Sequence, residues 1–246
     1  MKVKNIKSFV DFYKSLEIST CIASIPRSKI IKEKNRHLAN KNQLQITQPL
    51  STNIKEELNK LKDEINSCNC DLKDIATNLV FSDGQEKSNI MVIGEAPGAD
   101  EDKLGKPFVG QAGKLLNKMF NLIGLDRQIN FYITNVIFWR PPGNRTPSKL
   151  EIEACLPFTK KHIRIIKPKL LILLGNVAAQ SILCKNEGIN ILREENNFFE
   201  DDFSELKIPA KAIFHPAYLL RNPLAKKKMW DDLLNINQYI CQKNLI

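Results

Sequence analysis

The chain has 246 residues, 43% of them hydrophobic, which is enough for one sizeable domain with an appendage. Its 37 Lys and Arg residues against 27 Asp and Glu residues give a net charge of +10, which favours a polyanionic partner such as nucleic acid. The absence of any apolar run of about eighteen residues, and of an apolar signal segment at the start, excludes a membrane-spanning helix and predicts a cytoplasmic protein.

Residues 1–55 are predicted to form a basic appendage and flexible linker ahead of a domain that spans residues 56–246. Six basic residues and one acid lie between Arg27 and Lys41. Such a segment buries too little apolar surface to order itself. It is either a plain solvated linker or an arm that touches a nucleic-acid backbone. Apolar residues three or four apart between Ile54 and Ile65 then predict an amphipathic helix.

The rest of the chain is organised around the stretch 90–113. Ile90–Ile93 is a continuous apolar run, typical of a buried parallel strand, and Gly94, Pro97 and Gly98 then turn the chain through a tight loop. Because loops at the carboxyl ends of parallel strands border the ligand crevice, we expect a pocket here. The side chains expected in it are Glu95, Asp100, Glu101 and Phe108. The alternative is an ordinary strand-to-helix connection with solvated acids.

Further strands are predicted on either side of this one. Val80–Phe81 is expected to form an edge strand, and residues 131–136 a second central strand with Asn135 at its carboxyl end, beside the same crevice. The stiff, proline-rich loop that follows carries Arg140 and Arg145, two side chains that suit phosphates.

Leu170–Leu174 is predicted to be a third buried strand. The next helix opens at Asn176, where free backbone amides could receive a phosphate. Residues 185–210 are acidic and are expected to form an irregular excursion, and residues 211–214 form the last strand, ending at His215. Alternating strands and helices with short connections predict an α/β fold, a three-layer α-β-α sandwich around a mainly parallel four-stranded sheet.

Five motifs follow one another in the chain: the acidic glycine loop at 94–101, Thr134-Asn135, the loop Pro141–Arg145, Leu174–Ala179 and His215-Pro216. In this order they resemble the uracil-DNA glycosylase superfamily, most closely its family 4 bacterial enzymes. The resemblance runs from about Cys70 to Leu234. It implies hydrolysis of the N-glycosidic bond between deoxyribose and uracil, with the base flipped into a pocket, and hence the start of base-excision repair.

The resemblance also implies roles in the pocket. Phe108 would stack on the flipped uracil, and the Asn135 amide would pair with its edge; a core phenylalanine and an asparagine that caps the strand end are the alternatives. His215 would donate a hydrogen bond to uracil O2 while the leaving base gains negative charge. The residues that shape the pocket loop or act from it are Gly94, Glu95, Ala96, Pro97 and Gly98.

Glu101 matches a carboxylate that lies near the base. It would position water or stabilise positive charge on the sugar, unless it excludes a 5-methyl group. Ala96 stands where other branches of the superfamily carry a water-activating aspartate, so that route is closed. Leu219 or Leu220, with Arg221, would supply the wedge that fills the vacated base stack.

Family 4 enzymes hold a four-iron four-sulfur cluster on four cysteines, and the chain departs from that pattern. Cys70 and Cys155 fall at matching positions, but Ser67 and Trp139 occupy the other two, with Cys68 one residue out of register. Since such a cluster needs four thiolates, we expect no cluster and no other metal, and the chemistry requires no cofactor.

Three functions remain open at this point. The first is a uracil-DNA glycosylase that acts on uracil-containing DNA as a monomer, away from membranes. The second is an inactive or weakly active module that binds damaged or uracil-containing DNA, although a pure binder would not need Glu101. The third is a glycosylase with a broader range of deaminated bases.

Overall fold

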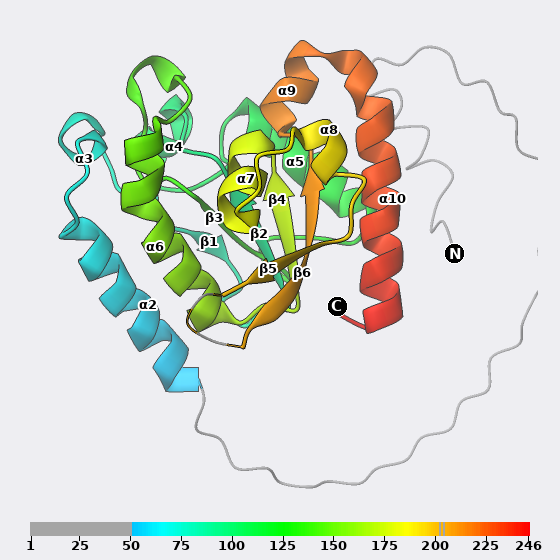
Figure 1. Cartoon of the computed structure of the whole chain (residues 1–246), viewed down its shortest axis with the longest axis horizontal. Coiled ribbons are helices and arrows are strands. Elements are labelled where there is room, and N and C mark those ends of the chain that lie inside the picture. Colours follow the sequence, from blue (N-terminus) through cyan, green and yellow to red (C-terminus); the bar gives the residue numbers. More distant parts are fainter. Residues whose placement is uncertain (1–50, 202, 204) are drawn as a thin grey trace, which may run out of the picture. The chain divides into compact units, whose positions relative to one another are not determined.

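The computed structural model describes residues 51–201, 203 and 205–246 (Figure 1). Residues Asn53–Ile246 form one compact unit. The basic segment between Arg27 and Lys41 lies outside the described residues, so the boundary and role given to residues 1–55 stay predictions. Among the helices described, none combines the length and apolar character that a membrane span requires.

The described elements alternate along the chain. The helices are α2 (Ser51–Asn66), α3 (Leu72–Ile75), α4 (Ala99–Leu104), α5 (Gln111–Leu122), α6 (Lys149–Ile166), α7 (Asn176–Leu183), α8 (Ile189–Leu192), α9 (Pro216–Arg221) and α10 (Lys226–Lys243). The strands are β1 (Asp83–Gly84), β2 (Ile90–Gly94), β3 (Tyr132–Asn135), β4 (Leu170–Leu174), β5 (Asn197–Glu200) and β6 (Lys207–Ile213). Two short 3-10 turns are η1 (Pro142–Asn144) and η2 (Pro223–Ala225).

These strands form one six-stranded sheet in the order β1-β3-β2-β4-β6-β5. The inner strands β3, β2, β4 and β6 are parallel, and β1 and β5 pair antiparallel at the edges. β2, β3 and β4 are buried along their whole length, because helices cover both faces of the sheet, and this explains their continuous apolar sequences. The prediction of an α/β sandwich around a mainly parallel sheet is confirmed.

The prediction is wrong at both edges of the sheet. Residues 185–210 are not an irregular excursion, since they contain α8, β5 and the first part of β6. Buried and exposed residues alternate along β5, so an acidic strand forms with its charge on the solvent side. At the other edge, Val80–Phe81 lies outside the strand, and the two-residue β1 pairs with β3 instead.

Helices cover the two faces of the sheet, with α7 in front of it and α5 behind it in the view of Figure 1. On one face, apolar residues of α2, α6 and α7 pack with those of β2 and β4 in one continuous core. α2 contributes Leu58, Leu61 and Ile65, each at most 3% exposed. The apolar face of this amphipathic helix is therefore part of the domain core.

The carboxyl edge of the parallel strands gathers the residues with predicted function. Gly94 at the end of β2 lies opposite Asn135 at the end of β3. Gly175 follows β4, and its backbone N–H donates to Ile213 O on β6 at 2.8 Å, which holds these two strand ends together just before His215. A ligand crevice is expected at this edge of a parallel sheet.

Truncating Leu61 to alanine should lower the free energy of unfolding by about 2–5 kcal/mol, because loss of the fully buried side chain leaves a cavity where α2 packs into the core. Urea unfolding followed by circular dichroism measures this. The control is Leu150→Ala on α6, where 77% exposure predicts a change within about 0.5 kcal/mol. Equal effects in the two variants would contradict the packing of α2 in the core.

Candidate functional site

A cavity of about 390 Å³ opens at the carboxyl edge of the sheet. It brings together predicted pocket residues and two of the predicted DNA-contacting arginines. They are Glu95, Ala96, Pro97, Gly98, Glu101, Phe108, Asn135 and His215, with Arg145 and Arg221. Lining residues to which the sequence analysis gave no individual role are Ala112, Pro141, Asn144, Thr146, Ala217 and Tyr218. Several of these are sequence neighbours of motif residues, and their position in the loops around Arg145 and His215 is the signal that could have found them.

The amide of Asn135 is the buried polar group of this cavity. The residue is 1% exposed at the end of β3, and its Oδ1 has no hydrogen-bond partner among the described residues. Gly94 makes room for this amide: a Cβ atom at Gly94 would lie 2.4 Å from Asn135 Oδ1 and 2.4 Å from Phe108 Cζ. A buried acceptor without a partner is costly, so this oxygen is suited to receive a donor from a ligand.

Two rings lie close to this amide. Phe108 and His215 have ring centroids 5.8 Å apart with an interplanar angle of 37°, and both line the cavity. The Phe108 ring packs against Gly94, the last residue of β2. The cavity therefore offers an aromatic face, an amide edge and an imidazole to a planar ligand.

The protonation of His215 follows from its place at the start of α9. It caps this helix, and its Nδ1 accepts a hydrogen bond from the Ala217 backbone N–H at 3.2 Å. Burial, together with a smaller contribution from the Arg221 cation, lowers the pKa of His215 to about 4. A neutral ring whose Nδ1 accepts carries its proton on Nε2, so His215 is a hydrogen-bond donor there at neutral pH.

The carboxylates differ in their surroundings. Glu101 accepts from the backbone N–H groups of Gly98, Val109 and Gly110 at 3.2, 2.9 and 2.8 Å. Glu95 is partly buried, and burial raises the pKa of its carboxyl, an effect that the Arg221 cation opposes. Both glutamates line the cavity. Glu101 is held to the loop by hydrogen bonds to both of its oxygens, whereas the Arg221 cation acts on Glu95.

The third predicted acid, Asp100, does not belong to the cavity. It is exposed on α4 and is not among the lining residues. Its carboxylate lies beside the same loop that Glu101 holds, since a Cβ atom on Gly110 would lie 2.8 Å from Asp100 Oδ2, but it remains at the exposed rim of that loop.

The predicted DNA-contacting side chains lie in different places. Arg145 lines the cavity and pairs with Glu151 through two hydrogen bonds of 2.9 and 2.5 Å, whereas Arg140 bonds Asn144 at 2.7 Å. Asn176 is exposed and bonds Gln180 at 2.9 Å, outside the cavity.

Of the two leucines predicted as a wedge, Leu219 is 0% exposed because it faces the core side of α9, which does not favour that role. Leu220 on the same short helix is 44% exposed and stays a candidate. Leu224 in η2, which the sequence analysis did not consider, is 89% exposed.

The residues at the cluster positions do not fit a four-cysteine iron–sulfur site. Cys70 and Cys155 are buried thiols in the core, and Trp139, 2% exposed, stands where a ligand would be needed. Burial is the main cause that raises the pKa of the Cys155 thiol, and the neighbouring Cys70 adds to it. The Ser67 hydroxyl donates to Asp63 O at 2.9 Å. In the described part of the chain, no group of three or more His, Cys, Asp or Glu side chains could hold a metal ion.

Comparison with known proteins relates this architecture to a family. The sequence profile described as "Uracil DNA glycosylase superfamily" matches residues 81–234. The Type-4 uracil-DNA glycosylase of Archaeoglobus fulgidus is 41% identical over 191 residues, which are 76% of this chain and 95% of the relative. That of Sulfurisphaera tokodaii is 39% identical over 187 residues, 74% of this chain and 84% of the relative. That of Thermotoga maritima is 38% identical over 170 residues, 68% of this chain and 86% of the relative.

His215 should remain neutral, with its proton on Nε2, down to about pH 4. Long-range proton–nitrogen NMR spectra measure the tautomer and the midpoint. Because the folded pKa lies below the unfolded value of 6.5, the unfolded chain takes up the proton first, and the His215 contribution to stability is lost as the pH falls from 6.5 toward 4. Arg221→Gln should raise the midpoint. A midpoint near 6.5 in the folded protein would contradict the assignment.

Proposed function

Because the chain belongs to the uracil-DNA glycosylase superfamily, we propose that it hydrolyses the N-glycosidic bond of uracil in DNA and so initiates base-excision repair. The resemblance stated from the motifs is confirmed by the family match and by relatives with up to 41% identity. An enzyme that acts on a base must extrude it from the duplex into a pocket and read its edge. The cavity at the carboxyl edge of the sheet has the groups that this requires.

The unpartnered Asn135 Oδ1 is the observation that carries the proposal. It would accept the N3–H of uracil, while the amide NH₂ of the same side chain donates to uracil O4. Cytosine would meet the same amide with an acceptor at N3 and a donor at C4. Each buried mismatch of this kind costs on the order of 1–3 kcal/mol, which is enough to reject cytosine. Phe108 would cover the face of the base.

His215 would stabilise the departing base. When the bond from C1′ to N1 breaks, its electron pair stays on uracil and negative charge spreads to O2. A neutral imidazole with Nε2–H directed at this oxygen is a preorganised donor that needs no proton transfer. Burial of His215, together with Arg221, keeps the ring in this form at neutral pH.

The two glutamates would divide the remaining work. Glu101 already accepts three backbone N–H groups, which supports a role in holding the loop around Phe108 rather than in contact with the sugar. Glu95 is the carboxylate that we assign to the reaction: it would attract the positive charge that develops on the sugar and take a proton from the water that adds to C1′. Ala96 offers no carboxylate of its own.

The positive surplus of the chain and the arginines near the cavity would bind the DNA backbone. Arg145 and Arg221 line the cavity, and Arg140 lies on the same stiff loop as Arg145. Leu220 would enter the vacated base stack, and Asn176 would offer the first backbone amides of α7 to a phosphate. We further propose that the protein acts as a monomer in the cytoplasm, without contact with membranes.

We also propose that the chain folds and acts without an iron–sulfur cluster. Trp139 and the thiols Cys70 and Cys155 belong to the hydrophobic core, so apolar packing stabilises this region. A cluster would need four thiolates at these positions. No step of the proposed reaction uses a metal.

Asn135→Asp should lower single-turnover release of uracil by orders of magnitude, because a carboxylate cannot donate to O4. A uracil-containing oligonucleotide is incubated with enzyme, and the abasic product is cleaved with alkali. Asn235→Asp, an exposed position outside the cavity, is the matched control and should keep the wild-type rate. Unchanged release by Asn135→Asp would reject the base-reading role. Binding of the oligonucleotide by the wild type without any abasic product would identify a binding module instead.

Removal of iron should leave the enzyme unchanged. Protein produced in iron-depleted medium, and protein reconstituted anaerobically with iron and sulfide, should give the same single-turnover rate and the same unfolding midpoint. Elemental analysis and visible absorption measure incorporation. A brown preparation with near-stoichiometric iron and sulfide, or activity that depends on reconstitution, would overturn the proposal.

A further inference from the structure

We propose that Arg127 is a positioning residue of the glycosylase: its buried guanidinium fixes the backbone on which Phe108 presents its ring to the base. The inference rests on the proposed function, since it concerns the ring assigned to stack on uracil. Arg127 follows α5 in the chain and does not line the cavity, and no motif of the sequence analysis includes it.

Phe108 has a backbone conformation that its own chemistry disfavours. Its φ angle is 54°, in the left-handed region, where a bulky residue is a rare outlier. Such a residue persists only where the surroundings determine it, and these sites cluster where a ligand is bound. Gly113 on α5 permits the conformation, because a Cβ atom there would lie 2.0 Å from Phe108 O.

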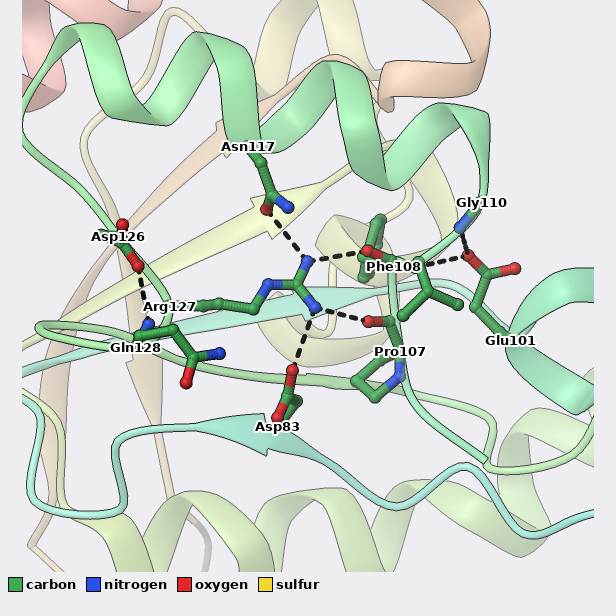
Figure 2. A network of polar contacts seen from close by, with 10 residues as sticks. Asp83, Glu101, Pro107, Phe108, Gly110, Asn117, Asp126, Arg127 and Gln128 are labelled. Atoms are coloured by element: carbon green, nitrogen blue, oxygen red, sulfur yellow. Dashed lines mark hydrogen bonds and ion pairs between the residues drawn. The ribbon is translucent and has the colours of Figure 1, made fainter. Parts of the chain in front are cut away.

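Arg127 supplies the surroundings on the carbonyl side of Phe108. Its Nη1 donates to Pro107 O at 2.9 Å and its Nη2 donates to Phe108 O at 2.7 Å, so the planar fork holds two successive carbonyls (Figure 2). Glu101 holds the amide side of the same turn through the N–H groups of Val109 and Gly110. The loop is therefore fixed on both sides of the residue with the unfavourable φ angle.

The guanidinium is itself held from two elements. Asp83 on β1 accepts from Nη1 at 3.2 Å, and Asn117 on α5 accepts from Nη2 at 3.0 Å (Figure 2). Arg127 is 8% exposed, and Asp83 is the acid that balances its charge. Its Nε has no hydrogen-bond partner among the described residues. The two carbonyls therefore receive their hydrogen bonds although one donor of the arginine remains without an acceptor.

This geometry requires arginine. A guanidinium presents parallel donors in a rigid plane and can hold two carbonyls and two side-chain acceptors at once, whereas a lysine ammonium is a compact charge on a flexible stem. A lysine at this position would keep the ion pair with Asp83 and lose one of the carbonyl contacts. The stacking ring, 5.8 Å from His215, would then no longer be held in its position above the strand ends.

The experiment compares Arg127→Lys and Arg127→Met with the wild type. Single-turnover release of uracil at saturating enzyme should fall about 100-fold in Arg127→Met, the loss expected from a displacement of about 1 Å at a reacting group, and less in Arg127→Lys. Inhibition by free uracil should weaken by a similar factor. Binding of DNA without uracil should stay within about threefold, because the phosphate contacts are unchanged.

Leu61→Ala is the stability-matched control. It destabilises the domain from α2, which contributes no residue to the lining of the cavity. At a temperature well below its unfolding midpoint it should keep the wild-type rate and the wild-type inhibition by uracil. Asn117→Ala removes one support of the guanidinium and provides a second route if the Arg127 variants fail to fold. It should lower uracil release and uracil inhibition together.

A double-mutant cycle with Phe108→Ala decides the matter. If Arg127 acts through the ring, Arg127→Lys should add less than about twofold to the loss already caused by Phe108→Ala. Independent, multiplicative losses in the double variant would overturn the proposal, as would unchanged uracil inhibition in all Arg127 and Asn117 variants. Failure of the wild type to release uracil would instead refute the proposed function.

Discussion

The site depends on a close approach at the ends of two neighbouring parallel strands. Gly94 and Asn135 are paired in the register of β2 and β3, and Phe108 returns over them from the following loop. A methyl group at Gly94 would overlap both side chains, each at 2.4 Å. The Asn135 amide and the Phe108 ring can share one small cavity only because β2 ends in a glycine, which has no side chain to occupy the space between them.

Burial then gives the polar groups of the cavity their chemical properties. The same desolvation that leaves Asn135 Oδ1 in need of a donor lowers the pKa of His215 and raises that of Glu95. Each shift favours the neutral form of the group, and the nearby Arg221 assists it at His215 and opposes it at Glu95. Arg221 is therefore the group that favours both the neutral imidazole and the ionised carboxylate in this cavity.

The loop around Phe108 shows how the domain maintains an unfavourable backbone conformation. Carbonyls are held by Arg127 and amides by Glu101, and both side chains come from elements outside the turn. In the core cluster, Trp139 and buried thiols pack where the relatedness to family 4 would imply an inorganic cluster. In both places, packing and hydrogen bonds within the chain set the geometry.

The sequence by itself determined the central parallel strands and the meeting of Phe108, Asn135 and His215, because apolar runs specify buried strands and parallel strands end at one edge. It did not determine the roles of Glu101, Leu219 and Arg127. Adjacent residues of a short helix differ in burial only through what packs against them, and a carboxylate in a motif reads the same whether it faces substrate or backbone amides. The Arg127 contacts join residues 19 and 20 positions apart, and only the tertiary structure brings such groups into hydrogen-bonding distance.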